Sequence, residues 1–276
     1  MKNIMRLGVL SLTITILWFY TKRASTSKDE NENEKVLVTV LESQVSGLDP
    51  VRGSGVYDAQ AMGRLYDGLL EYHYLKRPFE LVPNLAAAMP TVSEDGLVYT
   101  FEIKQGVKFH DNACFPQGQG RELVAEDFIY SIKRVADPKI QSPSFSMIAE
   151  RIEGLDAWRD KYVDASEVVY DEAVTGLRAI DKYTLQFTLT KPWPQFMCIL
   201  AMPVGYAVPQ EAVRHYGAEF INHPVGTGPF MLQEFNPQLS KLQYYKNPTF
   251  RDKRFPSEAA AAYQPMLADA GKNYRW

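Results

Sequence analysis

The segment from residue 95 to residue 138 constrains the fold most, because its apolar pattern changes from a period of two residues to helical spacing. The sequence LVYTFEIK at residues 97–104 alternates between two faces, as a half-buried strand does. A QG pair then breaks the strand, and VKFHD resumes the extended pattern. Helical spacing follows in four apolar residues, Val124, Phe128, Ile132 and Val135. Because Pro138 ends this last element, the segment predicts a strand, a turn and an amphipathic helix.

Periodicity and turn residues predict further elements along the chain. These are a helix at residues 58–70, a hairpin at residues 177–189, a helix that starts after Pro209 and stops at Gly217, and a hairpin at residues 230–246. The apolar run VLVTVL at residues 36–41 predicts a buried strand. The predicted fold class is therefore mixed α/β.

Val124 stands where the helix after residue 124 begins. A side-chain oxygen at such a position accepts a hydrogen bond from the first turn, and valine has none. We expect this to lower helix stability by about 1 kcal/mol unless another group substitutes. The preceding residues 112–121 contain Gly118 and Gly120 and are predicted to form a surface loop.

Four short motifs carry a resemblance to a known family. They are LDP at residues 48–50, GVKFHD at residues 106–111, AEDF at residues 125–128 and GTGPF at residues 226–230. In this order and spacing they resemble family 5 of the solute-binding proteins of bacterial ABC importers. That family includes oligopeptide- and dipeptide-binding proteins.

The resemblance implies a domain layout. Its members have a periplasmic binding protein-like type II lobe, a small inserted α/β domain and a separate closing lobe. Here residues 36–67 would be the first pass of lobe I, residues 68–176 the inserted domain II, and residues 177–276 the return to lobe I. The chain would end at the hinge to a missing lobe III, so the closing lobe is expected to be absent.

The N-terminal residues predict export. Basic residues flank an uncharged run at residues 7–20, which is too short to span a bilayer comfortably. Residues 1–24 therefore read as a signal peptide or an N-terminal anchor, and residues 25–35 as a polar linker. The expected location is the periplasm or cell envelope. Cleavage and retention as an inner-membrane anchor by residues 7–20 both remain open.

Composition excludes some functions. The 276 residues suffice for one large or two ordinary domains, and the net charge of -3 gives no electrostatic case for a nucleic-acid partner. Cys114 and Cys198 could form one disulfide, but two separate buried thiols are favoured. No cofactor or metal is expected.

The resemblance also implies a function. The chain would be the substrate-binding component of an ABC importer, which captures a peptide or related small solute in a cleft between lobes. It would act as a monomer and deliver this solute to the membrane permease subunits. Because such proteins bind by closing two lobes, a chain without the closing lobe is expected to bind peptide weakly or not at all.

The resemblance points to five ligand-binding residues, namely Ser54, Gly55, Val56, Phe145 and Thr227. The first three follow the LDP turn, where relatives pair with the backbone of an extended ligand. Phe145 falls near an aromatic position of the peptide cleft, and Thr227 borders that cleft. An ordinary loop, core packing and a purely structural threonine remain the respective alternatives.

Two other functional classes are alternatives. One is a non-transporting fragment that acts as an envelope interaction or chaperone-like module. The other is a hydrolase, for which His110, Asp111 and Cys114 would supply a metal or thiol site. A turn aspartate and a core cysteine are more common, and no histidine pair has metal-ligand spacing. The chain is therefore predicted not to be an enzyme, with no catalytic residue.

Overall fold

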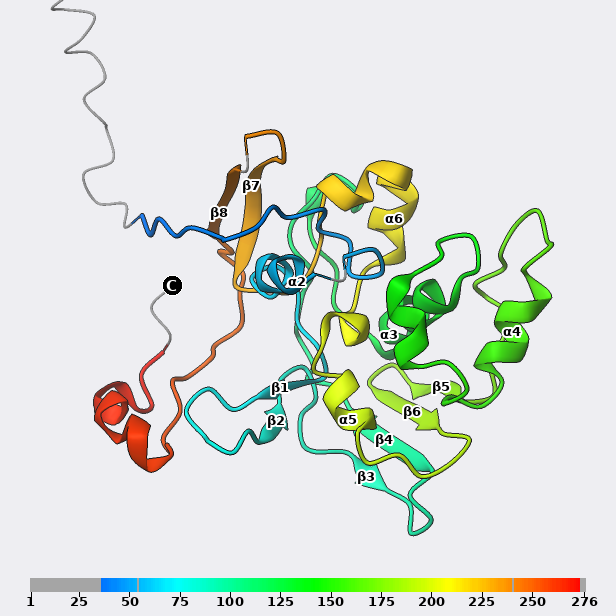
Figure 1. Cartoon of the computed structure of the whole chain (residues 1–276), viewed down its shortest axis with the longest axis horizontal. Helices are drawn as coiled ribbons and strands as arrows, with labels where there is room; N and C mark the ends of the chain where they lie inside the picture. Colours follow the sequence, from blue (N-terminus) through cyan, green and yellow to red (C-terminus); the bar gives the residue numbers. More distant parts are fainter. Residues whose placement is uncertain (1–35, 54, 240, 274–276) are drawn as a thin grey trace, which may run out of the picture. The chain divides into compact units, whose positions relative to one another are not determined.

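The structure is a computed structural model of the whole chain, and it describes residues 36–53, 55–239 and 241–273. The chain divides into two compact units, Met1–Leu41 and Glu42–Trp276. The predicted signal peptide or anchor at residues 1–24 and the predicted linker at residues 25–35 lie outside the described residues. The fold below is that of the second unit (Figure 1).

The predicted buried strand at residues 36–41 is wrong. These residues belong to no strand, and Val36, Leu37 and Val40 are 78%, 87% and 89% exposed. An apolar run forms a strand only where a neighbouring edge accepts its backbone hydrogen bonds. Within the described chain, no such pairing is made by these residues.

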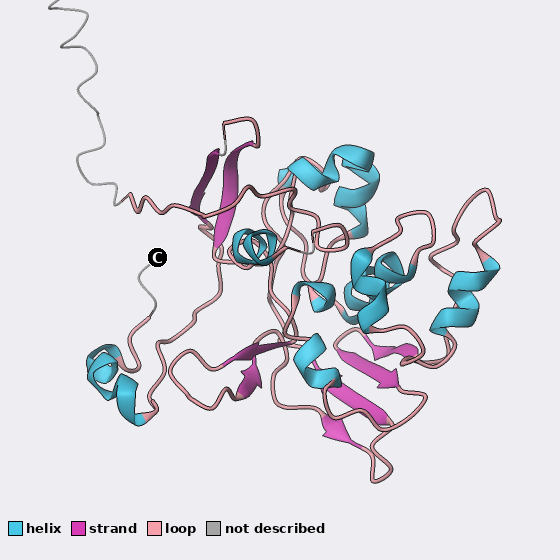
Figure 2. Ribbon diagram, viewed as in Figure 1, coloured by secondary structure: helices cyan, strands magenta, loops and turns pink. Residues whose placement is uncertain are grey.

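The second unit contains short helices and antiparallel strands (Figure 2). The α-helices are α2 (Val56–Met62), α3 (Ala125–Ala136), α4 (Leu155–Lys161), α5 (Phe196–Ile199) and α6 (Gln210–Tyr216). The 3₁₀-helices are η1 (Pro116–Gly118), η2 (Pro143–Met147), η3 (Pro203–Gly205), η4 (Gly217–Asn222) and η5 (Ala261–Asp269). The strands are β1 (Leu70–Tyr72), β2 (Leu81–Pro83), β3 (Thr91–Val92), β4 (Val98–Glu102), β5 (Leu177–Asp181), β6 (Thr184–Thr188), β7 (Phe230–Asn236) and β8 (Lys241–Lys246). The mixed α/β class predicted from the sequence is confirmed.

The largest sheet has the strand order β3-β4-β6-β5 and is antiparallel throughout. Tyr99 and Phe101 of β4 lie opposite Phe187 and Leu185 of β6, and all four side chains are buried. The rings of Phe101 and Phe187 meet edge to face with centroids 6.0 Å apart. Phe196 of α5 packs edge to face on Phe187 at 5.2 Å. The core of this region is thus an aromatic layer on one face of the sheet.

The other predicted elements are largely confirmed. Helix α3 and the hairpins β5–β6 and β7–β8 form where periodicity places them, and α6 starts after Pro209 and stops at Gly217. Figure 1 shows α3 beside β5 and β6, against which it packs. The boundary predicted between residues 176 and 177 remains a prediction, although the largest sheet contains strands from both sides of it.

Helix α2 is shorter than the helix predicted at residues 58–70. It ends at Met62, and the chain then turns. The carbonyl oxygens of Arg64 and Leu65 accept hydrogen bonds from the N–H groups of Phe230 and Gly228, at 3.1 and 2.9 Å. These bonds tie the turn to a distant segment, and a continued helix would place the same carbonyls inside its own ladder.

A buried ion pair joins the LDP turn to α3. Arg134 donates to both carboxylate oxygens of Asp49, at 3.0 and 2.9 Å. The two side chains are only 4% and 3% exposed. Burial lowers the pKa of Arg134, but Asp49 more than offsets this and raises it. The pair therefore locks two segments that are 85 residues apart in the sequence.

The start of α3 shows how the missing cap is replaced in part. The Asp127 carboxylate accepts a hydrogen bond from the Val124 N–H at 2.9 Å, but Val124 offers no side-chain acceptor to the first turn. We expect Val124→Thr to raise the free energy of unfolding by about 1 kcal/mol, because threonine keeps the shape and adds that acceptor. Urea unfolding measures the change.

The matched control is Val163→Thr, at a half-exposed valine outside any helix. This control should leave the free energy of unfolding unchanged. A destabilised Val124→Thr variant would show that the Val124 methyl groups matter more than the missing acceptor.

Candidate functional site

The predicted backbone-pairing loop is only partly described. Ser54 lies outside the described residues. Gly55 is the N-cap of α2, and Val56 is 70% exposed as its first residue. The Asp58 carboxylate accepts hydrogen bonds from the Gly55 N–H at 3.2 Å and from the Ser46 N–H at 2.8 Å. Asp58 thus fixes the conformation of the loop. The predicted pairing of the loop backbone with an extended ligand remains a prediction.

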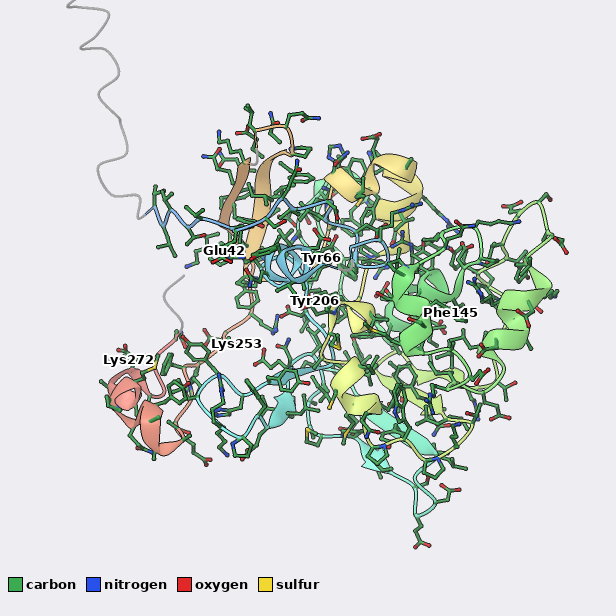
Figure 3. The ribbon with its side chains drawn as sticks, in the orientation of Figure 1. Glu42, Tyr66, Phe145, Tyr206, Lys253 and Lys272 are labelled. Carbon is green, nitrogen blue, oxygen red and sulfur yellow. The ribbon has the colours of Figure 1, made fainter. Side chains whose placement is uncertain are left out.

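Phe145 is half-buried in η2. The Arg159 guanidinium lies over its ring, 4.2 Å from the centroid, and also donates to the Ala136 carbonyl oxygen at 2.7 Å. Figure 3 shows Phe145 on the α3 and α4 side of the protein. The ring is therefore positioned by a cation–π contact and keeps part of its surface open. Its ligand-binding role remains a prediction.

Thr227 is buried, with 2% exposure. Its hydroxyl donates to the Asp67 carboxylate at 3.0 Å. The hydroxyl is therefore already used inside the protein, and the role of Thr227 at a cleft remains a prediction. Within the described residues, no hydrogen bond or ring contact joins Gly55, Phe145 and Thr227 to one another.

The GTG segment at residues 226–228 crosses very close to the backbone of Leu65. A Cβ atom on Gly226 would lie 2.1 Å from the Leu65 carbonyl oxygen, and one on Gly228 would lie 2.5 Å from its carbonyl carbon. Only glycine fits at these two positions. The two glycines thus permit a close backbone approach, with the turn between α2 and β1 as the neighbour.

His110 supports the same crossing from the other side. Its Nδ1 accepts a hydrogen bond from the Gly226 N–H at 3.3 Å, so Nε2 carries the proton and donates to the Gly228 carbonyl oxygen at 3.0 Å. The side chain is 2% exposed. Burial lowers the pKa of His110 to about 4, and the nearby carboxylates of Asp67 and Asp111 oppose this only in part. His110 is a neutral structural residue at pH 7.

This geometry argues against a hydrolase or metal site at residues 110–114. Both ring nitrogens of His110 are occupied by backbone groups. Burial raises the pKa of the Cys114 thiol to about 11, so it is not a thiolate at neutral pH. In the part of the chain that the structure describes, no group of three histidine, cysteine or acidic residues is arranged to hold a metal ion. Cys114 and Cys198 are both free and half-buried.

A polar network that sequence reasoning missed lies next to Thr227. The Arg251 guanidinium donates to the Asp67 carboxylate at 2.8 Å and to the Asn84 side-chain oxygen at 2.6 Å. Asn84 in turn donates to Asp67 at 3.0 Å. Burial alone raises the pKa of Asp67, but Arg251, together with Lys253 and Asn84, holds it below its usual value. Arg251 is 184 residues from Asp67, so no local spacing could reveal the pairing.

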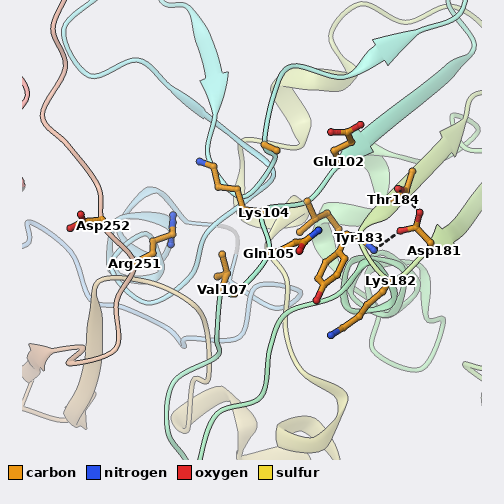
Figure 4. A pocket seen from close by; sticks show the side chains of 13 residues that line it. Glu102, Lys104, Gln105, Val107, Asp181, Lys182, Tyr183, Thr184, Arg251 and Asp252 are labelled. Carbon is orange, nitrogen blue, oxygen red and sulfur yellow. Dashed lines mark hydrogen bonds between the residues drawn. The ribbon is translucent and has the colours of Figure 1, made fainter.

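A pocket of about 790 Å³ opens beside this network (Figure 4). Its lining includes Lys104, Gly106, Tyr183 and Arg251, and no residue predicted to bind ligand is among the lining residues. Figure 4 places Lys104 and Arg251 on one side, and Glu102 and Asp181 on the other. The pocket therefore has charged groups of both signs and could hold a small polar molecule.

No described helix meets the length and apolar character required to cross a membrane. The uncharged run at residues 7–20 lies outside the described residues, so both its cleavage and its use as an anchor remain predictions.

Comparison with known proteins gives one consistent result. Residues 80–269 match the family described as bacterial extracellular solute-binding proteins, family 5 Middle. The chain is 31% identical over 222 residues to di/tripeptide-binding protein 2 of Pseudomonas aeruginosa. The matched region covers 78% of this chain and 38% of that protein. It is 28% identical to the periplasmic oligopeptide-binding protein OppA of Escherichia coli. That match covers 86% of this chain and 40% of OppA.

The fold is similar to part of a solved structure, OppA of Listeria monocytogenes bound to peptide. The TM-score is 0.64 at 22% identity, and the match covers 80% of this chain and 40% of that one. The likeness shows the fold. The chain thus spans about 38–40% of the length of these relatives.

Proposed function

The chain belongs to family 5 of the bacterial extracellular solute-binding proteins, and we propose that it serves as the peptide-binding component of an ABC importer, or as part of one. The family consists of solute-binding proteins, which are not enzymes. The observation that carries the proposal is the match over residues 80–269, together with relatives named as di/tripeptide- and oligopeptide-binding proteins. Similarity covers most of this chain.

The proposed partners and location follow from the same relatives. The ligand is a peptide or a related small solute, and the protein partners are the membrane permease subunits, which a monomeric chain would contact. One relative is named as periplasmic, which supports a periplasmic or envelope location for this chain. The proposed layout is a lobe I interrupted by an inserted domain, with peptide in a cleft that a further lobe closes.

Phe145 offers a direct test of peptide binding. We expect these 276 residues to bind tripeptides more weakly than about 0.1 mM, because they span only 38–40% of the length of their relatives and so offer a ligand fewer contacts. Phe145→Ala should lower this affinity about fivefold through the loss of an aromatic contact. Ligand-observed NMR with mixed tripeptides at millimolar concentration measures both effects.

The matched control is Phe79→Ala, at a 65% exposed phenylalanine on the β1–β2 hairpin loop. This variant should bind as the unmodified chain does. Micromolar binding would contradict the expected weakness of the chain, and an unchanged affinity of Phe145→Ala would contradict a ligand contact by Phe145.

The envelope interaction or chaperone-like role remains the second prediction. Suppression of aggregation of a denatured client protein, at a level that added peptide does not change, would favour it. Stabilisation of the chain by peptide would favour transport instead.

A further inference from the structure

The pocket of Figure 4 is lined by Lys104, whose ammonium forms no ion pair with any residue that the structure describes. The Lys104 Nζ donates to the Asn84 carbonyl oxygen at 2.7 Å. Among the described residues, no carboxylate oxygen lies within 4.0 Å of this nitrogen, whereas Lys182 on the same pocket pairs with Glu122 at 2.7 Å. Lys104 is half-buried, so water compensates its charge only in part.

A second cation is held by the same asparagine. The Arg251 guanidinium donates to the Asn84 side-chain oxygen at 2.6 Å, while Lys104 uses the backbone oxygen of that residue. Two positive groups are therefore gathered around one neutral residue, and they repel each other.

The two carboxylates nearest this cluster, those of Asp67 and Glu71, are each paired with a cation other than Lys104. Asp67 pairs with Arg251, and Glu71 pairs with Lys253, so neither of these two acids forms an ion pair with Lys104 in the described part of the chain. Burial, followed by the repulsion of Arg251, lowers the pKa of Lys104. Glu71 and Asp67 act in the opposite direction, and Lys253 adds to the repulsion. An anion on Lys104 would give its ammonium the close partner that these residues do not supply.

We propose that this pocket binds the carboxylate of a small solute, with the Lys104 ammonium as its main partner and Arg251 as the second positive group. The ammonium has two N–H donors beyond the one that Asn84 takes, which suits one carboxylate. Glu102, Asp181 and Asp252 also line the pocket and repel a doubly charged anion more strongly than a singly charged one. The site therefore selects a carboxylate over a phosphate.

The probe is sodium acetate, titrated against sodium chloride at constant ionic strength. In the full chain, acetate should produce a saturable shift of the backbone amide NMR signals of Gln105 and Gly106, which directly follow Lys104 in the sequence and also line the pocket. Lys104→Met should weaken acetate binding at least tenfold. Lys182→Met, on the same pocket, should leave it within twofold of the unmodified chain.

Several outcomes would overturn the proposal. These are amide shifts that grow linearly with acetate, shifts of the same size in chloride, or a Lys104→Met variant that binds acetate unchanged. Inorganic phosphate that binds as tightly as acetate would overturn the choice of a carboxylate. If Lys104→Met does not fold, the acetate, chloride and phosphate titrations of the unmodified chain still decide the matter. None of these measurements uses peptide. A negative result would therefore overturn the carboxylate site without bearing on the proposed transport function.

Discussion

Replacement of Asp49 by alanine is expected to lower the free energy of unfolding by about 3–5 kcal/mol, because it leaves the Arg134 guanidinium buried without its carboxylate. The Nε atom of Arg134 is already buried without a hydrogen-bond partner among the described residues. Few other groups therefore remain to stabilise the guanidinium charge once Asp49 is removed. Urea unfolding at pH 7 measures the change. Asp49→Asn keeps the shape and should also be destabilising, since it removes the charge.

A double-variant cycle separates the pair from its surroundings. Arg134→Met replaces the guanidinium by an apolar chain, and the combination with Asp49→Ala should cost less than the sum of the single changes. Glu234→Ala breaks the exposed pair with Lys241 and should cost less than about 1 kcal/mol. Additive effects of the two buried replacements would contradict a direct interaction between Asp49 and Arg134.

Acidification is expected to destabilise the chain through His110 before most carboxylates are protonated. An unfolded chain protonates this histidine below about pH 6.5, whereas burial lowers its pKa to about 4 in the folded chain. The contribution of His110 to the free energy of unfolding is therefore fully present above pH 6.5 and is lost as the pH falls from 6.5 to 4. The loss amounts to about 3 kcal/mol, since each pKa unit corresponds to roughly 1.4 kcal/mol.

The main physical cause is burial of the ring, which disfavours its charged form. The hydrogen bond at Nδ1 acts in the same direction. A second proton on the ring would face the Gly226 N–H, which is itself a donor. Urea unfolding at intervals between pH 7 and pH 4 measures the slope. His110→Asn should remove most of it, whereas His215→Gln, at an exposed histidine, should preserve it. An equal slope in His110→Asn and the unmodified chain would assign the acid sensitivity to other groups.

Elements that depend on nearby residues could be predicted from the sequence. Helix α3 and the hairpin β5–β6 follow from periodicity and turn residues. Elements that depend on distant partners could not. Helix α2 stops early because Gly228 and Phe230 bind the carbonyl groups that follow it, and residues 36–41 lack the strand partner that their pattern requires.

The candidate sites show the same division. The resemblance to a family gave Phe145 a position, but only the structure shows that Arg159 holds its ring. The network of Asp67, Asn84 and Arg251 leaves no signal in the sequence, because its members are neither periodic nor close together. Polar networks assembled from distant segments require the three-dimensional contacts to be known.

The contact between His110 and Gly228 also determines how late in protein synthesis this part of the fold can form. The hydrogen bond from the Nε2 of His110 spans 118 residues, so its acceptor is made long after its donor. At about 5–20 residues per second, a ribosome needs roughly 6–24 s to bridge that interval. Until then the segment around His110 lacks this partner, so the hydrogen bonds between His110 and residues 226–228 form only late in synthesis.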